Sequence, residues 1–276
     1  MRSLPRCVYI DILSYTPRIS ASSYSNTAPL IWSFLYGSNH GKVELILDNA
    51  PARSAELLDQ DRVDAALVPV IAYQTLADVK LVPGVCVGAK ERVRSVCLIT
   101  RGIDLADARS VALDVSSRTS VALVKLIFRE FMSREPSFVS AQPNIEEMLA
   151  IADAALIIGD PALALSKSQQ EFRIYDLAEL WREHTGLGFV FAMWMTRRDA
   201  LTIDFAAARD EGLANAESIA ASYEAHLPLS QIEIRDYLTQ NISYSPDESM
   251  LRGMELYFEL AYKHKLINAN KELVFV

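Results

Sequence analysis

The chain has 276 residues, about half of them hydrophobic, which is enough to bury a large core and more than one typical domain needs. Its formal net charge is −8 and no segment is rich in lysine and arginine, so the basic face that a nucleic-acid backbone requires is missing. The charge therefore argues against nucleic acid and favours a small molecule or a protein as partner. That small molecule can still be an anion, because solvent screens remote charges while amides and hydroxyls act at contact range.

The cysteines and the apolar runs restrict the compartment. Cys7, Cys86 and Cys97 show neither a CxxC pair nor the Cys/His spacing of a zinc site, so we expect no disulfide framework and no metal. The stretch after Cys7 lacks the apolar core of a signal peptide, because Asp11 interrupts it. No apolar run approaches the ~20 residues that cross a bilayer. The sequence predicts a protein of the reducing cytoplasm that does not associate with membranes.

Short β-branched runs alternate with helical stretches in the first third of the chain. The expected strands cover residues 18–22, 43–47, 64–68 and 93–100, and the expected helices cover residues 54–61 and 70–76 together with a first helix that starts near Pro29. This alternation is typical of an α/β lobe.

A second α/β series begins after Gly102, where the first pattern breaks. The expected strands cover residues 110–113, 154–158 and 189–196, and the expected helices cover residues 120–133, 161–166 and 177–185. From Ile203 onward the chain forms three amphipathic helical blocks, separated by turn signals at residues 227–228 and 244–246.

Two such series predict an α/β fold with two lobes. We assign residues 1–100 and 195–276 to the first lobe, with the C-terminal helices packed on it, and residues 101–194 to the second. The chain then passes between the lobes twice, so two crossing strands join them. A connection of this kind places a ligand cleft between the lobes.

A polar turn joins the strand 18–22 to the helix that follows. Thr27 is a candidate N-cap, and Pro29 stands in the first turn, where its missing N–H costs nothing. The free amides of a helix start attract anions. On its local pattern alone, this turn fits an ordinary capped junction without a ligand better than a binding site.

A second polar turn precedes the helix 120–133 and contains Ser117, Arg118, Thr119 and Ser120. Its hydroxyls and amides gather at a helix N-terminus, which favours an anion. The guanidinium of Arg118 suits a carboxylate or phosphate, but it equally suits solvent. An ordinary Ser/Thr cap is the alternative interpretation.

A third turn follows the strand 154–158. Asp160 is the expected helix cap there and Pro161 the first helical residue, so a structural role is favoured. Gly159 also allows a ligand to approach the backbone closely. Ser95 lies in the crossing strand 93–100, where a lone hydroxyl bonds to backbone more often than to a ligand.

Several common catalytic signatures are absent from the sequence. No GxSxG, GxGxxG or GxxxxGK[ST] motif occurs, which disfavours the usual hydrolase, dinucleotide and P-loop sites. The histidines lie far apart and outside the three turns, which disfavours a histidine metal site or base; they are His40, His184, His226 and His264. Trp181 and Trp194 fit core packing better than a stacking platform.

Four motifs occur in a specific order: SYSNTAPL at residues 23–30, SRTSVAL at 117–123, IGDPAL at 158–163 and WxxxTGL at 181–187. Together they resemble the chorismate dehydratases of the futalosine route to menaquinone, whose fold is the periplasmic-binding-protein type 2 fold. The resemblance covers the chain after about Pro17, and residues 1–15 have no counterpart. The chain departs from the family at Ser25, Val70 and Gly188, which stand where an apolar residue, a serine and a proline are usual. Gly188 is expected to loosen the second crossing.

The resemblance implies that the protein removes water from chorismate to give 3-[(1-carboxyvinyl)oxy]benzoate without a cofactor. It implies a catalytic Asn26, which would orient the leaving hydroxyl or stabilise developing charge. Among the matched motifs only Asp160 is an ionisable candidate base, so we expect the enolpyruvyl carboxylate of the substrate to take the proton. The residues expected to bind the substrate are Tyr24, Thr27, Ser95, Ser117, Thr119, Ser120, Gly159, Asp160 and Phe189.

Two other functions remain open on the sequence. A solute-binding protein without chemistry would use the same fold, although the export signal it needs is not evident. The related 1,4-dihydroxy-6-naphthoate synthase of the same pathway opens with a different motif and is expected to use a histidine. The oligomeric state is not predicted.

Overall fold

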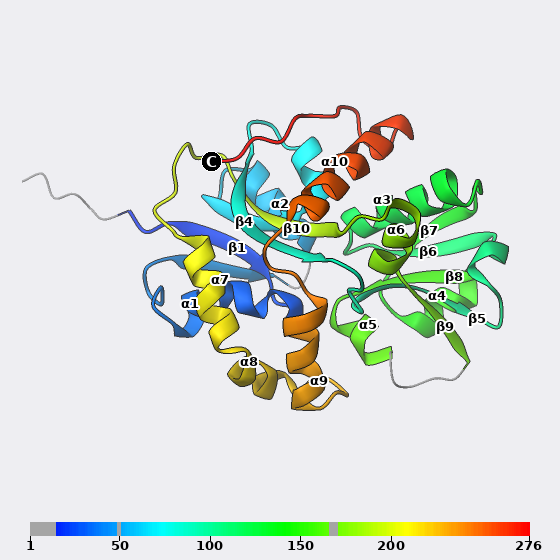
Figure 1. Cartoon of the computed structure of the whole chain (residues 1–276), viewed down its shortest axis with the longest axis horizontal. Coiled ribbons are helices and arrows are strands. Elements are labelled where there is room, and N and C mark those ends of the chain that lie inside the picture. The colour runs from blue at the N-terminus through cyan, green and yellow to red at the C-terminus, as the bar shows by residue number, and fades with distance from the viewer. Residues whose placement is uncertain (1–14, 49–50, 166–170) are drawn as a thin grey trace, which may run out of the picture.

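A computed structural model describes residues 15–48, 51–165 and 171–276. Two five-stranded mixed sheets stand side by side, and helices cover both (Figure 1). Outside the described residues lie residues 1–14, which include Cys7 and most of the segment without a family counterpart. Ser166, the last residue of the expected helix 161–166, also lies outside them.

In the first sheet, three neighbouring strands pair in parallel, and two further strands are added beside the last of them. Its order is β2 (Glu44–Asp48), β1 (Arg18–Ser22), β3 (Ala65–Pro69), β10 (Phe189–Thr196) and β4 (Lys80–Ala89). β1 pairs in parallel with β2 and β3, whereas β10 runs antiparallel between β3 and β4. All five residues of β3 are buried, as expected for a central strand that is covered on both faces.

The second sheet repeats this plan. Its order is β7 (Ser137–Ala141), β6 (Ser110–Asp114), β8 (Ala154–Ile158), β5 (Val96–Arg101) and β9 (Phe172–Asp176). β6 pairs in parallel with β7 and β8, and β5 runs antiparallel between β8 and β9. Each sheet therefore contains one strand, β10 or β5, that runs antiparallel to the two strands beside it and is distant from both in the sequence.

The strand pairing shows that the chain crosses between the sheets earlier than the sequence predicted. β5 belongs to the second sheet over its whole length, and β10 belongs to the first. The chain thus passes between sheets at residues 90–95 and again between residues 185 and 189, earlier than the boundaries expected after residues 100 and 194. The division into two lobes stays a prediction, and we propose these earlier boundaries for it.

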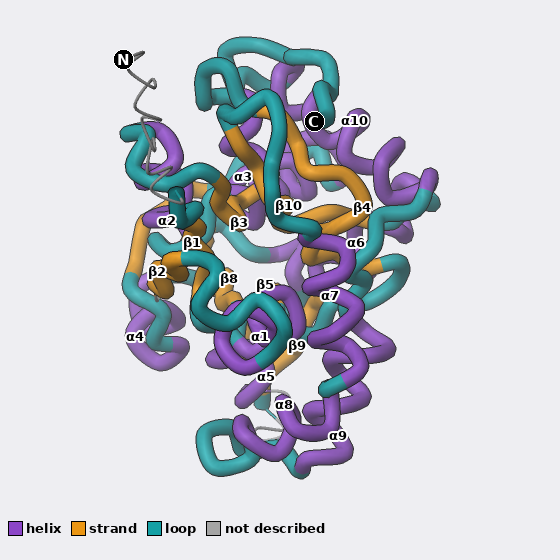
Figure 2. Tube along the Cα trace, turned by 90° about the vertical axis from the view of Figure 1, so that its left-hand side faces the viewer, coloured by secondary structure: helices purple, strands orange, loops and turns teal. Residues whose placement is uncertain are grey.

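Helices cover both faces of the first sheet. α1 (Ala28–Tyr36) packs against α7 (Phe205–Ala214), and α8 (Ala216–Tyr223) and α9 (Gln231–Asp236) continue on the same side (Figures 1 and 2). On the opposite side, α2 (Pro51–Asp59) packs on β3 and β1, and α10 (Glu248–Lys263) packs on β10. The C-terminal helices therefore cover the first sheet, as predicted.

The second sheet is covered by α3 (Thr119–Leu126), α4 (Ile145–Ile151), α5 (Asp160–Leu165) and α6 (Leu177–Thr185). α3 continues into a π-helical turn, η4 (Ile127–Phe131), and a second π-helical turn, η5 (Tyr237–Asn241), follows α9. Short 3₁₀ turns complete the described elements, namely η1 (Ser25–Thr27), η2 (Val70–Gln74) and η3 (Leu105–Asp107). α6 shows clear end signals, because the Asp176 side chain caps its N-terminus and Gly186 adopts a φ of +72° at its C-terminus.

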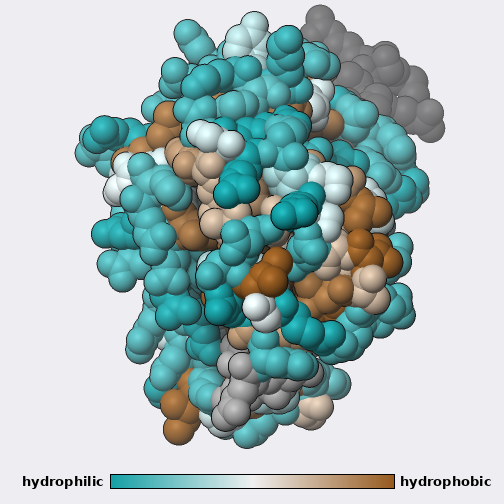
Figure 3. Space-filling model, turned by 90° about the vertical axis from the view of Figure 1, so that its right-hand side faces the viewer, coloured by the Kyte–Doolittle hydropathy of each residue, from teal (hydrophilic) through white to brown (hydrophobic). Residues whose placement is uncertain are grey.

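The core extends through both sheets. Trp181 and Trp194 are fully buried, which confirms their predicted packing role. The ring of Trp181 contacts Phe189 and Tyr257 at centroid distances of 5.4 and 6.3 Å. The surface on the side of the second sheet is mostly hydrophilic, with apolar side chains in small separate patches (Figure 3). Among the helices of the described residues, none is both long and apolar enough to span a membrane.

Candidate active site

The three polar turns meet between the two sheets. Each turn follows the C-terminal end of a parallel strand: β1 leads to residues 22–27, β6 to residues 115–120, and β8 to Gly159. In open α/β sheets this is the edge where ligands bind. The cavity that these turns enclose is lined by Ser22, Tyr24, Asn26, Thr27, Pro51, Leu67, Pro69, Val87, Val96, Ser117, Thr119, Ser120, Ile158, Gly159, Phe191 and Ala192.

The first turn is held by its own backbone. The Thr27 hydroxyl donates to the carbonyl oxygens of Ser22 and Tyr24 at 2.6 and 2.8 Å. Thr27 stands at the N-cap of α1, as predicted, but its side chain makes no capping hydrogen bond to a helix amide. Pro29 does stand in the first turn of α1. The resulting turn is tight and places the side chain of Asn26 on the cavity wall.

Asp160 bridges the two sheets. Its carboxylate accepts hydrogen bonds from the backbone N–H of Ser25, at 3.1 Å, and from the Ser25 hydroxyl. Asp160 is the first residue of α5 and binds the opposite turn, so the prediction that it caps its own helix is wrong. Burial raises the pKa of Asp160, and the bonds from Ser25 oppose that rise. The departure of Ser25 from the family pattern thus adds a second donor to this bridge.

Tyr24 reaches across to the second sheet as well. Gly159 has a φ of +67°, and a Cβ atom there would lie 3.1 Å from the Tyr24 ring. Glycine is therefore needed for both its backbone conformation and the close approach of the ring. The Tyr24 hydroxyl interacts with the side chain of Ser116, while burial raises the pKa of this tyrosine. Tyr24 and Ser25 together hold the cavity in a closed form.

The second turn forms the facing wall. The Ser117 hydroxyl accepts a hydrogen bond from the backbone N–H of Ser120 at 3.3 Å. The Thr119 hydroxyl donates to the Phe191 carbonyl at 3.1 Å, so it also ties this turn to the first sheet. Arg118 points elsewhere, is 42% exposed in its side chain, and pairs with Glu56 at 3.6 Å. Its guanidinium does not line the cavity.

Three residues predicted to bind substrate do not line the cavity, and one of them is Asp160, the residue that bridges to Ser25. Phe189 is buried in the aromatic cluster around Trp181, and Phe191 faces the cavity in its place. The two residues lie two positions apart on β10, and their rings are in contact at 4.7 Å, so the sequence alone did not separate them. Ser95 is fully buried outside the lining, with its hydroxyl 3.5 Å from the Val93 carbonyl. Of the predicted residues, Tyr24, Asn26, Thr27, Ser117, Thr119, Ser120 and Gly159 line the cavity together.

The structure also explains two of the sequence departures. Val70 is fully buried and is not part of the cavity lining. Gly188 donates its N–H to the Ser249 hydroxyl at 3.2 Å, and a Cβ atom there would lie 2.6 Å from Met250. Close packing against α10, rather than a loose crossing, is therefore what the structure shows at Gly188.

The cavity lining combines polar and apolar side chains. Among the described lining residues, none has a carboxylate, imidazole, ammonium or guanidinium group. Two carboxylates stand behind the walls. Asp160 is partly buried and binds Ser25, and Asp114 is fully buried and accepts hydrogen bonds from the Ser116 N–H and hydroxyl at 2.8 and 2.6 Å. Burial raises the pKa of Asp114. The lining can therefore offer hydroxyls, backbone amides and the Asn26 amide to a ligand.

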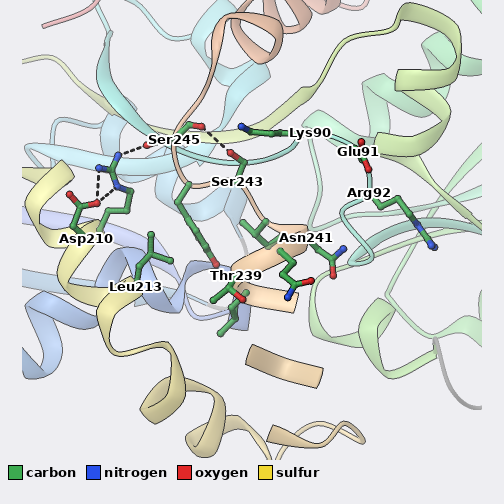
Figure 4. Close-up of a pocket in the computed structure, with 14 residues that line it drawn as sticks. Lys90, Glu91, Arg92, Asp210, Leu213, Thr239, Asn241, Ser243 and Ser245 are labelled. Atoms are coloured by element: carbon green, nitrogen blue, oxygen red, sulfur yellow. Dashed lines mark hydrogen bonds and ion pairs between the residues drawn. The ribbon is translucent and has the colours of Figure 1, made fainter. Parts of the chain in front are cut away.

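A wider hollow lies outside this cavity, between α7, residues 90–92 and residues 238–245 (Figure 4). Its cations are already paired within the described part of the chain. Arg209 binds Asp210 at 2.7 Å and the Ser245 hydroxyl at 2.6 Å, and Lys90 pairs with Asp247 at 3.1 Å. This hollow is thus a weaker candidate than the cavity between the turns.

Comparison with known proteins shows which family the chain belongs to. Residues 17–263 match a protein family described as menaquinone biosynthesis. The chain belongs to this menaquinone biosynthesis family. A relative from Thermus thermophilus, named chorismate dehydratase, is 31% identical over 261 residues, which cover 86% of this chain and 92% of that protein. The family expected from the four sequence motifs is therefore confirmed.

Solved structures support the fold of this family member. A protein from Archaeoglobus fulgidus superposes with a TM-score of 0.74 at 17% identity, covering 92% of this chain and all of that one. The periplasmic aliphatic sulphonate binding protein SsuA from Escherichia coli gives a TM-score of 0.63 at 16% identity, covering 94% and 93% of the two chains. The predicted periplasmic-binding-protein-like α/β fold is confirmed, and at these identities the likeness concerns the fold alone.

Proposed function

We propose that this protein is a cytoplasmic chorismate dehydratase, a hydro-lyase that converts chorismate into 3-[(1-carboxyvinyl)oxy]benzoate and water. The observation that carries the proposal is the cavity between the turns, in which hydroxyls and the Asn26 amide stand among apolar side chains, in a chain that is 31% identical to a chorismate dehydratase. The proposal covers the reaction, the residues that perform it and the compartment.

Such a lining suits a ligand with two carboxylates and a hydroxyl. The N-terminus of α3 supplies backbone N–H groups near Ser117 and Ser120, and helix N-termini stabilise negative charge. Serine and tyrosine hydroxyls add further donors. Binding then requires no arginine or lysine in the lining, because several neutral donors share the charge of each carboxylate.

The reaction is a 1,2-elimination. The C–H bond at the ring carbon that bears the enolpyruvyl ether breaks, and its electron pair becomes the new ring double bond. The neighbouring hydroxyl leaves and combines with a proton to form water. Because the ring becomes aromatic, the overall step is downhill, and the protein needs only to lower the barrier.

We infer that the base is the enolpyruvyl carboxylate of the substrate. Its support is that no described lining residue has a carboxylate or an imidazole. The two carboxylates behind the lining already accept hydrogen bonds, Asp160 from Ser25 and Asp114 from Ser116. A closed cavity that holds the substrate carboxylate over the ring proton provides a high effective concentration of base. Asn26 would then orient the leaving hydroxyl or stabilise the charge that develops on it.

The two alternative functions have less support. A passive solute-binding protein would share the fold, but the family match concerns a biosynthetic pathway. The related naphthoate synthase is expected to use a histidine, and none lies among the described lining residues.

An absorbance assay tests the proposal. Purified protein is mixed with chorismate, and the cyclohexadiene absorbance is followed while an aromatic ether forms. We expect complete conversion with release of one water per substrate. Chorismate that binds and survives would instead support the solute-binding function.

A further inference from the structure

An ion pair joins the helices of the two sheets beside the candidate active site. The Arg118 guanidinium lies 3.6 Å from a carboxylate oxygen of Glu56, and the two side chains are 42% and 44% exposed. Arg118 directly precedes α3, which covers the second sheet, whereas Glu56 belongs to α2, which packs on the first. The pair therefore connects the two halves of the structure at a position that solvent reaches.

Both partners of this pair stand next to residues that line the cavity. Ser117 and Thr119, on either side of Arg118 in the chain, are lining residues, and so is Pro51, the first residue of α2. Arg118 itself lines a neighbouring surface groove of about 300 Å³, and Ser117 is a lining residue of both the groove and the cavity. The pair thus lies at the rim of the cavity.

The guanidinium of Arg118 is only loosely partnered. Glu56 is held more closely by Arg53, which donates to its carboxylate at 2.8 Å. Arg118 stays beyond hydrogen-bond distance of Glu56, and its side chain makes no hydrogen bond with another residue in the described part of the chain. Because a guanidinium presents a fork of N–H donors that matches a carboxylate, the donors of Arg118 are available to an anion from solution.

The rim is locally positive although the whole protein is not. The formal net charge is −8, but the groove contains Arg118 and Lys125 and has no carboxylate among its described lining residues. With Arg53 and Glu56 included, the rim holds three cations against one carboxylate. Solvent screens charges beyond about 10 Å at 0.1 M salt, so an approaching anion responds to these nearby cations more than to the net charge.

We propose that Arg118 captures the anionic substrate at the rim and positions it for entry into the cavity. A substrate carboxylate replaces Glu56 as the partner of the guanidinium, and it passes to the hydroxyls and amides of the Ser117–Ser120 turn as the cavity closes. The exchange costs little, because an exposed ion pair contributes little stability and Arg53 continues to neutralise Glu56. This inference rests on the proposed function, which supplies a substrate with two carboxylates.

The test measures how fast chorismate associates with the wild-type protein and with Arg118→Gln, by stopped-flow protein fluorescence over a range of salt concentrations. We expect Arg118→Gln to lower the association rate constant about tenfold at about 20 mM salt and less than about twofold at about 0.5 M salt, because screening removes the steering. kcat should stay within about twofold of wild type, since Arg118 lies outside the cavity lining.

Two further variants separate local charge from fold and from net charge. Arg101→Gln is the matched control, because Arg101 is 40% exposed, pairs with Glu146 at 2.7 Å and lies outside the cavity lining. It changes the net charge by the same amount and should keep the wild-type association rate constant at every salt concentration. Arg118→Lys keeps the positive charge and should retain the salt dependence of the wild-type protein.

An association rate constant for Arg118→Gln equal to that of wild type contradicts the proposal, and so does a loss of the same size at low and high salt. A kcat lowered together with the association rate constant would place Arg118 in the chemical step and overturn its assignment to entry. Chorismate that binds the wild-type protein at a salt-dependent rate but survives is a different outcome, because it removes the proposed dehydration and leaves the capture by Arg118 in place.

Discussion

Asn26 is the residue on which the proposed chemistry depends most. It was predicted from one motif, and it lies on the cavity wall opposite the Ser117–Ser120 turn in a lining whose described residues carry no ionised group. A neutral amide can donate to a departing oxygen without holding a charge of its own, which suits a site that must also accept two substrate carboxylates.

We expect Asn26→Ala to lower kcat by roughly 10²- to 10³-fold, the usual effect of removing one donor that stabilises developing charge. Asn39→Ala is the matched control, because Asn39 donates to the Ser33 hydroxyl at 2.9 Å, outside the cavity lining. Steady-state rates with chorismate and circular dichroism of both variants make the comparison. Near-normal turnover of a folded Asn26→Ala protein removes Asn26 from the mechanism.

Asp64 illustrates a residue whose charge serves the fold. Burial pushes the pKa of this carboxyl up, but hydrogen bonds from the Tyr15 hydroxyl, the Arg18 N–H and the Arg198 guanidinium, at 2.6, 2.8 and 2.9 Å, outweigh it and lower the pKa. The folded state therefore favours the ionised form. Its contribution is complete above the unfolded pKa of about 3.9 and is lost as the pH falls through the lower folded value.

Asp64→Asn should accordingly reduce the free energy of unfolding by about 1–3 kcal/mol at pH 7, and the difference from wild type should shrink as the pH falls below about 4. Urea unfolding at a series of pH values measures this. A difference that stays constant down to pH 2 would show that the carboxylate charge is not what stabilises the site.

At the scale of elements, hydrophobic pattern was a good guide where strands are buried on both faces. The strands at 18–22, 154–158 and 189–196 and the helix at 177–185 were predicted with their observed bounds. β7 and β9 were missed because exposed polar residues interrupt them, as in Ser137–Ala141. The helix expected over 120–133 is α-helical only to Leu126, and a π turn follows it. The spacing of apolar residues does not predict such a turn.

The hydrophobic pattern of the buried strands also located part of the candidate site. Turn residues after buried strands can be read from the sequence, so nearly all of the polar lining was identified, whereas apolar lining residues such as Leu67, Val87 and Phe191 were not. The Asp160 bridge depends on a contact between residues 135 positions apart in the sequence, which no local pattern encodes.

α10 packs closely against the second crossing, at Gly188. A Cβ atom at Gly253 would lie 2.1 Å from the Gly188 carbonyl oxygen, so this helix needs a glycine where it meets the crossing. Gly253→Ala should lower the free energy of unfolding by about 1–3 kcal/mol or more through overpacking, although helix propensity alone would raise it by about 1 kcal/mol. The exposed neighbour Arg252→Ala should stay within about 0.5 kcal/mol of wild type. Thermal unfolding of Gly253→Ala above the wild-type temperature would contradict the contact.

At the scale of the whole molecule, the cavity is closed by contacts between the two sheets. Ser25 and Tyr24 reach Asp160 and Gly159, and Thr119 reaches back to β10. Closure excludes water from the cavity and holds the substrate carboxylate near the ring proton. The apparent affinity for substrate therefore depends on the equilibrium between open and closed forms of the cavity.

Ser25→Ala removes one of the two donors to Asp160 and should favour the open form. A hydrogen bond to a charged group contributes about 1.5–3 kcal/mol, so we expect KM to rise about tenfold or more while kcat changes little. Ser54→Ala is the control, because the equally buried Ser54 hydroxyl bonds Ser20 at 2.9 Å within one lobe. Equal KM values for the two variants would mean that the Ser25 bridge does not govern closure.

The most direct test of the central claim uses the substrate itself as the base. Chorismate and an analogue whose enolpyruvyl carboxylate is replaced by a neutral amide are each incubated with the wild-type protein, and the products are followed by proton NMR. The account predicts that chorismate becomes the aromatic enolpyruvyl ether while the analogue remains unchanged. Survival of chorismate, or conversion of the analogue at a comparable rate, would contradict it.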